Sequence, residues 1–278
     1  MSDVPIPLFH VNAFTDQPFS GNPAAVCPLQ DWLDDETLRK VAAENNLSET
    51  AFFVSRGGQE GQRDGRGVGH YNLRWFTSRC EVVLCGHATL ASAYVVMNLL
   101  RPGLEAVQFH TRRSGVLRVS RDGEMFAMDV PAMRAKPCER PPERLARGLG
   151  LEQLPGVVLE ANETYVVVYE TEEAIQNIRP DCAQLEQLHP FAVAVTAPGK
   201  KSDFVSRYFA PSYGIPEDPV TGSSHCVLAP YWADRLCKSQ LYARQISQRG
   251  GEIWCQMAGE RVILKGGAVL TLRGSLLI

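Results

Sequence analysis

The spacing of apolar residues predicts short strands and a few helices in each half of the chain. Leu38, Val41 and Ala42 fall on one face of a helix predicted over residues 35–44, with Asp34 or Asp35 as its N-cap. Residues 7–14, 50–54 and 71–76 read as strands, and a glycine-rich loop over residues 57–69 separates the last two. Residues 116–119 and 125–130 flank Asp122-Gly123, which predicts a β-hairpin.

Two segments are apolar on nearly every face and are therefore expected to be buried helices. They span residues 88–100 and 223–237, and each follows a glycine, Gly86 or Gly222. Pro230 lies inside the second segment, so we expect it in the first turns or at a bend. A second hairpin is predicted over residues 251–270. The pattern indicates an α+β fold in which a curled, mostly antiparallel or mixed sheet surrounds each apolar helix.

An internal repeat relates the two halves. Residues 74–77 (Arg-Trp-Phe-Thr) reappear as residues 207–210 (Arg-Tyr-Phe-Ala), and after a three-residue insertion the match continues at a constant offset. This predicts two similar domains related by pseudo-twofold symmetry, residues 1–131 and 132–278, with the last strand a candidate for packing on the first domain. Because ligands favour domain interfaces, the cleft between the domains is the expected site.

Composition narrows the classes of function. The 278 residues carry 28 basic and 31 acidic side chains without a basic stripe, so a nucleic-acid partner is not expected. We find no segment long and apolar enough for a membrane span and no export signal, so we expect a cytoplasmic protein without a membrane partner. The eight cysteines lack zinc or iron–sulfur spacing, so neither a metal nor a disulfide framework is predicted.

Glu49 is a candidate general acid/base. It lies where the first predicted helix gives way to an apolar strand, next to Ser48. A carboxylate at such a position is usually a surface group. Its flank of Leu47, Ala51, Phe52 and Phe53, however, would desolvate the carboxyl group and raise its pKa towards neutrality.

The starts of the two apolar helices are candidate anion sites. Gly86 and Gly222 stand where strand becomes helix, and backbone N–H groups at a helix start bind carboxylates or enolate oxygens. The alternative is that these glycines only permit tight turns. The repeats differ at two places: Asp218 replaces Val82, and Ser223 replaces His87. Glu49, His87 and Asp218 thus form an asymmetric titratable set around Gly86, Gly222 and Ser223.

Six ordered motifs resemble the phenazine-biosynthesis PhzF-like family, which has the diaminopimelate-epimerase-like fold. They lie at residues 11–14, 21–26, 46–50, 74–77, 85–89 and 217–223 and cover essentially the whole chain. The resemblance implies two similar domains, an active site between them, a homodimer and an isomerisation without a cofactor. Carried over, Glu49 moves a proton on a small carboxylated substrate, and Ser48, Gly86, His87, Asp218, Gly222 and Ser223 line the site.

One departure separates this chain from the amino-acid epimerases that share the fold. Those enzymes place a cysteine before the glycine of each half, whereas here Cys85 precedes Gly86 but Thr221 precedes Gly222. The first hypothesis is therefore an isomerase that depends on Glu49. A racemase or epimerase using Cys85 with a non-thiol base is the second, and a non-catalytic binding or scaffold protein is the third.

Overall fold

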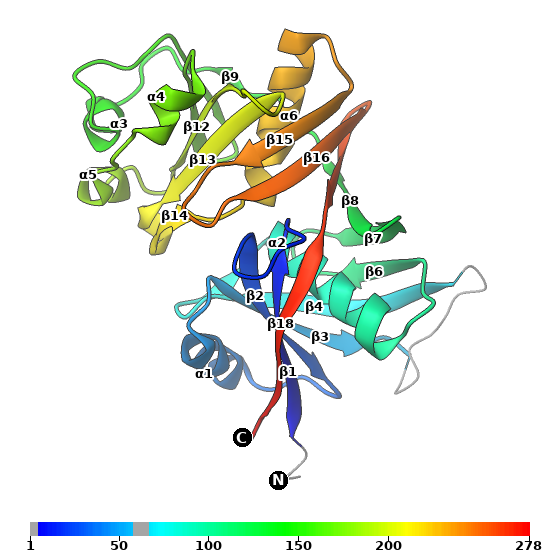
Figure 1. Cartoon of the computed structure of the whole chain (residues 1–278). Coiled ribbons are helices and arrows are strands. Elements are labelled where there is room, and N and C mark those ends of the chain that lie inside the picture. Colours follow the sequence, from blue (N-terminus) through cyan, green and yellow to red (C-terminus); the bar gives the residue numbers. More distant parts are fainter. Residues whose placement is uncertain (1–4, 58–66) are drawn as a thin grey trace. The chain divides into compact units, whose positions relative to one another are not determined.

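The computed structural model describes residues 5–57 and 67–278, which form two compact units (Figure 1). The first unit comprises Met1–Asp129 together with Lys265–Ile278, and the second comprises Val130–Leu264. Part of the predicted glycine-rich loop, residues 58–66, lies outside the described residues. Val68 and Gly69, at its end, already belong to the next strand, so the loop is shorter than the sequence suggested.

The first unit is a mixed sheet. Its β1 (Ile6–Ala13) pairs antiparallel with both β2 (Asn22–Leu29) and β18 (Ala268–Leu276), so the two ends of the chain share one sheet. Next, β3 (Glu49–Ser55) runs parallel to β2 and antiparallel to β4 (Val68–Phe76). Strand β4 also pairs with the short β5 (Glu81–Val82) and runs parallel to β6 (Ala106–His110). The hairpin predicted around Asp122-Gly123 is confirmed as β7 (Val116–Asp122) and β8 (Met125–Pro131).

Two helices pack on this sheet. The predicted helix at residues 35–44 is confirmed as α1 (Asp35–Asn45), and Asp34 caps it by accepting a bond from the Thr37 amide. Helix α2 (Gly86–Tyr94) is buried along most of its length and contacts β1, β2, β3 and β18. The apolar run then continues as a π-helical segment, η1 (Val95–Leu100). Burial on every face of α2 agrees with its sequence, which has no polar side.

The second unit pairs its strands in the same sequence of parallel and antiparallel steps. Strand β9 (Lys136–Pro137) pairs with β10 (Val157–Ala161), β10 with β11 (Thr164–Val168), and β11 runs parallel to β12 (Ala192–Pro198). Then β12 pairs with β13 (Phe204–Ala210), and β13 pairs with β14 (Ile215–Asp218) and, in parallel, with β15 (Gln240–Gln245).

Short helices and the last strands complete the second unit. Its η2 (Pro211–Tyr213) is a 3₁₀ turn between β13 and β14, at the place of the insertion in the repeat. Strand β16 (Gly251–Ala258) pairs with β15 and is followed by β17 (Arg261–Gly266). The short helices α3 (Glu143–Gly148), α4 (Glu172–Gln176) and α5 (Cys182–Glu186) contribute to a cluster of buried apolar residues with β12 and β13.

The apolar helix of the second unit is α6 (Gly222–Leu236), which contacts β15 and β16. Pro230 lies inside it rather than in its first turns, which corrects the first of our two expectations. A proline lacks the N–H that would bond the carbonyl four residues earlier. That carbonyl belongs to Cys226 and instead accepts the Met133 amide at 2.9 Å, so the proline leaves no unpaired oxygen there.

The predicted hairpin over residues 251–270 is wrong at its end. Strand β17 stops at Gly266, and β18 begins at Ala268 as the partner of β1. The local pattern cannot distinguish a hairpin arm from a strand whose partner lies at the other end of the sequence. Among the described residues, none of the helices has both the length and the apolar character needed to cross a membrane.

Candidate active site

Glu49 is the first residue of β3 and follows directly from the end of α1. Asn46 ends that helix in the left-handed conformation (φ 50°), which turns the chain back towards the sheet. Glu49 is 9% exposed, and the half-buried Ser48 precedes it in the same turn. The side chains that follow, from Thr50 to Phe53, are buried. The carboxylate therefore lies at the edge of an apolar strand, in the environment that the sequence predicted.

Cys85 and His87 approach Glu49 from the start of α2. Nε2 of His87 lies 3.3 Å from Oε2 of Glu49, and its Nδ1 lies 3.5 Å from Sγ of Cys85. Both residues are buried, with 4% of His87 and 5% of Cys85 exposed. The imidazole thus stands between the thiol and the carboxylate, although 36 residues of sequence separate Glu49 from Cys85.

The imidazole of His87 is neutral at physiological pH, because burial lowers its pKa to about 3. A neutral ring has one N–H donor and one acceptor nitrogen. With Nδ1 accepting from the Cys85 thiol, the ring proton is on Nε2, which faces Oε2 of Glu49 at 3.3 Å. Because the imidazole is neutral, its contact with Glu49 is not an ion pair.

Asp218 is the last residue of β14 in the second unit and is 7% exposed. The Thr221 hydroxyl donates a short hydrogen bond to its Oδ2. Gln245, on β15, holds the backbone of the same turn. Its side-chain amide donates to the Asp218 carbonyl at 2.7 Å and accepts from the Thr221 N–H at 2.9 Å. The Thr221 hydroxyl therefore fixes the Asp218 carboxylate, and Gln245 in turn holds the backbone of Thr221 in place.

His225 lies one helical turn into α6 and is fully buried. Its Nδ1 lies 2.8 Å from the Thr221 carbonyl, which can only accept, so this nitrogen carries the proton. Burial lowers the pKa of His225 to about 4, although the bond to Thr221 acts in the opposite direction. Its Nε2 has no hydrogen-bond partner among the described residues.

The two helix starts have similar backbones. Neither Gly86 nor Gly222 has a positive φ, so neither is needed for a left-handed turn. The N-cap residues Cys85 and Thr221 are extended, and neither side chain caps the backbone of the first turn of its helix. The first-turn N–H groups therefore receive no side-chain cap, as an anion site requires. Ser223, the second residue of α6, is half-buried.

In each unit a buried arginine on a long strand bonds to a glutamate on the short strand that precedes the apolar helix. Arg74 on β4 forms two hydrogen bonds of 2.8 Å to Glu81 and a third to Asp35. Arg207 on β13 forms two bonds to Glu217, at 2.7 and 2.9 Å, and also donates to the carbonyls of Ile175 and Ile178. Val82 pairs with Trp75, and Asp218 pairs with Tyr208, so the strand register agrees with the repeat that we aligned.

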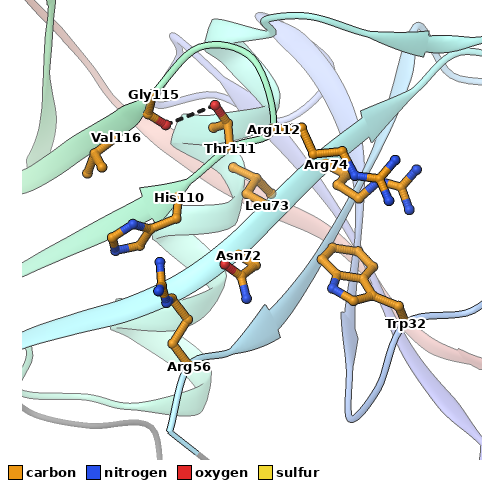
Figure 2. Close-up of a pocket in the computed structure, with 10 residues that line it drawn as sticks. All are labelled: Trp32, Arg56, Asn72, Leu73, Arg74, His110, Thr111, Arg112, Gly115 and Val116. Atoms are coloured by element: carbon orange, nitrogen blue, oxygen red, sulfur yellow. Dashed lines mark hydrogen bonds between the residues drawn. The ribbon is translucent and has the colours of Figure 1, made fainter.

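A separate cavity of about 360 Å³ opens on the face of β4 and β6 in the first unit (Figure 2). Arg56 and His110 point towards one another in it, and Trp32 and Arg74 lie at its other side. No residue of the predicted site lines this cavity. Its lining comprises Trp32, Arg56, Asn72, Leu73, Arg74, His110, Thr111, Arg112, Gly115 and Val116.

The structure thus groups the predicted residues by unit. Glu49, with Ser48 beside it in sequence, meets His87 near Gly86 in the first unit, and Asp218, Gly222 and Ser223 occupy one turn of the second. Sequence reasoning gave no role to Gln245 or His225. His225 stands two residues after the motif at residues 217–223 and was available as a signal, whereas Gln245 comes from a strand more than twenty residues away and had none.

Comparison with known proteins assigns the family. A family model described as phenazine biosynthesis-like protein, PhzC-PhzF, matches residues 11–274. An uncharacterized isomerase of Pseudomonas aeruginosa is 49% identical over 269 residues, which cover 97% of this chain and 98% of the relative. The crystal structure of a PhzF-family protein from Enterococcus faecalis has a TM-score of 0.88 and 38% identity, covering 99% of this chain and 100% of its own.

A more distant structure shares the fold alone. A hydroxyproline epimerase from Agrobacterium vitis has a TM-score of 0.60 at 10% identity, covering 98% of this chain and 91% of its own. The α+β, sheet-dominated fold predicted from the sequence is therefore confirmed as epimerase-like. By the match of the family model and the identity to its relatives, the chain belongs to the phenazine biosynthesis-like PhzC-PhzF family.

Proposed function

We propose that this isomerase moves a proton on a small carboxylated substrate and that Glu49 is its general acid/base. Membership of the family makes the chain an isomerase, and the proposal concerns its chemistry. The observation that carries it is the 3.3 Å contact between the Glu49 carboxylate and the buried, neutral His87 imidazole. A carboxylate held in this way, at a partly desolvated position, is suited to taking a proton from carbon.

The proposed reaction uses no group outside the chain. Glu49 removes a proton from one atom of the substrate, and the electron pair left behind delocalises towards the substrate carboxylate. The Glu49 carboxyl group exchanges this proton with water and then delivers a proton to a second atom, so the substrate changes its bonding and the enzyme is restored. His87 orients the carboxylate through its Nε2–H. Because the imidazole is uncharged, it does this without holding Glu49 in the strongly ionised state that a cation would impose.

The substrate anion is assigned to the helix starts. The uncapped first turns of α2 and α6, with Gly86, Gly222, Ser48 and Ser223, supply N–H and hydroxyl donors, and Asp218 assists or orients. The assignment of residues from both units to one site, and a homodimer as the assembly, rest on the sequence repeat and the family resemblance. Size-exclusion chromatography with light scattering measures the assembly directly.

The decisive experiment is proton exchange in heavy water. A panel of small carboxylates is incubated with the native chain and with Glu49→Gln, and the loss of individual proton NMR signals is followed. The native chain should wash out one signal, and Glu49→Gln should slow this about 10² to 10⁴-fold with little change in binding. Glu44→Gln is the matched control, because Glu44 is exposed on α1. Unchanged exchange in Glu49→Gln would remove Glu49 from the mechanism.

A second candidate function is a racemase or epimerase that uses Cys85. The observation in its favour is the 3.5 Å separation of the Cys85 Sγ from His87 Nδ1, which places a proton acceptor beside the thiol. This reaction would introduce deuterium at a stereocentre with inversion. Cys85→Ser would abolish it, whereas an isomerase that depends on Glu49 alone would keep most of its rate in the same variant.

A further inference from the structure

Glu49, Cys85 and His87 bring three different metal-binding donors to one place. One ligand atom from each, a carboxylate oxygen, a thiol sulfur and an imidazole nitrogen, lies within 4.8 Å of the other two. The sequence analysis placed Glu49 and His87 in one site but predicted no metal there, because two of the donors come from the start of α2 and the third from the start of β3. No CxxC or HxxxH spacing is present to reveal it.

The distances in the cluster are close to those of a tetrahedral site. Bonds of about 2.0 Å to nitrogen and oxygen and 2.3 Å to sulfur place tetrahedral ligands roughly 3.3 to 3.7 Å apart. His87 Nε2 lies 3.3 Å from Glu49 Oε2 and 3.9 Å from Cys85 Sγ. The Cys85 and Glu49 donors lie within 4.8 Å of each other, so these two side chains must approach one another to complete the site.

The donor set also selects the kind of ion. One thiolate, one imidazole and one carboxylate suit a borderline-soft divalent cation such as Zn²⁺ or Co²⁺ and are a poor match for Mg²⁺, which prefers oxygen ligands. Three protein ligands leave the fourth position of the tetrahedron for water or for a substrate oxygen. The Glu49 side chain retains 11% of its surface exposed, which gives such an ion access from solvent.

From this juxtaposition we propose that Glu49, Cys85 and His87 form a reversible Zn²⁺ site that blocks the enzyme. On binding, the Cys85 sulfur forms a bond to the ion and releases its proton to solvent, and no oxidation or reduction occurs. The ring proton of His87 shifts from Nε2 to Nδ1, which leaves Nε2 free to bind the ion. The ion then takes up this nitrogen and the Glu49 oxygen that lies 3.3 Å from it. The blocking role rests on the proposed function of Glu49, whereas the binding itself does not.

Cobalt(II) is the probe that tests the binding, because a thiolate bound to Co²⁺ gives an intense near-ultraviolet charge-transfer band. The full chain is titrated with Co²⁺ in a phosphine reductant. We expect the band to saturate at one ion per chain, to be displaced by Zn²⁺ and to be unaffected by excess Mg²⁺. Cys85→Ser should abolish the band, and Glu49→Gln and His87→Gln should each weaken binding by more than about 10-fold.

Cys80→Ser is the matched control, because Cys80 is exposed and lies outside the cluster. A band that survives in Cys85→Ser, or one that is lost in Cys80→Ser, would overturn the proposal, as would the absence of a band in the native chain at millimolar Co²⁺. Circular dichroism of each variant verifies its fold. If Glu49→Gln retains proton exchange while the cobalt results hold, the proposed function fails and the metal site stands.

Discussion

The starts of α2 and α6 are built on the same backbone plan but carry different chemistry. Each follows a short strand that pairs with the arginine-bearing strand, and each begins with an uncapped glycine turn. At α2 a thiol and an imidazole stand beside the carboxylate of Glu49. At α6 the Thr221 hydroxyl donates to the carboxylate of Asp218, and the Gln245 amide donates to the backbone carbonyl of the same residue.

The difference suggests a division of roles. At α2 the neutral imidazole of His87 has one donor nitrogen and one acceptor nitrogen, so its proton can be on either Nδ1 or Nε2. The groups at α6 are fixed, because Thr221 has its hydroxyl on Asp218 and its amide on Gln245. This difference fits the proposed function, in which Glu49 transfers the proton and Asp218 serves for orientation.

The largest effect on stability is expected at the buried arginine that each unit carries at an equivalent position. Replacing Arg207 with Met removes its bonds to Glu217 and leaves the carbonyls of Ile175 and Ile178 without their donor, so the free energy of unfolding should fall by about 3 to 5 kcal/mol. Arg74→Met should cost less, because one of its carboxylate partners, Asp35, has 65% of its side chain exposed and can be solvated.

Urea unfolding of both variants measures this difference. Arg147→Met is the control, because Arg147 pairs only with an exposed glutamate on its own helix and should cost less than about 1 kcal/mol. If Arg74→Met and Arg207→Met lose the same free energy of unfolding, the bonds from Arg207 to the carbonyls of Ile175 and Ile178 contribute nothing. This distinction between the two units would then be removed.

These arginine pairs also show what the sequence could and could not predict. The repeat placed Arg74 and Arg207, and likewise Glu81 and Glu217, at equivalent positions, but the pairing of each arginine with its glutamate became visible only in the structure. Strands with alternating apolar residues, the helix behind Asp34 and the Asp122-Gly123 hairpin were predictable because local spacing and turn chemistry determine them. Glu49, His87 and Asp218 were predictable as candidates because each breaks the repeat or stands in a recognised motif.

The features that were missed depend on contacts between distant segments. The pairing of β18 with β1 joins the two ends of the chain, and no local pattern encodes it. The amide of Gln245 reaches Asp218 from another strand, and the Met133 amide that satisfies the carbonyl exposed by Pro230 comes from almost a hundred residues away. The cluster of Glu49, Cys85 and His87 likewise required the packing of α2 on β3.

A smaller effect should follow from Thr221, the residue that most sharply distinguishes the two helix starts. Thr221→Val keeps the shape of the side chain and removes the hydroxyl that donates a hydrogen bond to Asp218. A hydrogen bond to a charged group contributes about 1.5 to 3 kcal/mol, so the free energy of unfolding should fall by that amount.

The matched control is Thr221→Ser, which keeps the hydroxyl and should lose less than half as much. If Asp218 is an orienting group, as proposed, Thr221→Val should also slow proton exchange on the substrate while leaving its binding nearly unchanged. If Thr221→Val unfolds at the same urea concentration as the native chain, the bond does not stabilise the fold, and the view that it fixes the Asp218 carboxylate is contradicted.

The smallest effect of one residue over one pH unit is a pH dependence that both starts share, because each contains a buried, neutral histidine. Unfolding exposes His87 and His225 to water, where their pKa returns to about 6.5, from about 3 for His87 and about 4 for His225 in the folded chain. Stability from these groups is therefore fully present above pH 6.5 and is lost as the pH falls towards the folded values. Between these limits each histidine should lower the free energy of unfolding by roughly 1.4 kcal/mol per pH unit.

Urea unfolding between pH 6 and pH 5 tests this dependence, in a range above the titration of carboxylates whose pKa is lowered in the folded chain, such as Glu81 and Asp203. His225→Gln should make the dependence shallower by the contribution of one histidine, and His87→Gln should do the same, because at these pH values both side chains are neutral in the folded state. If only one of the two substitutions changes the slope, the other histidine is charged when folded. A charged His87 would form an ion pair with Glu49, and its Nδ1 would no longer accept a hydrogen bond from the Cys85 thiol.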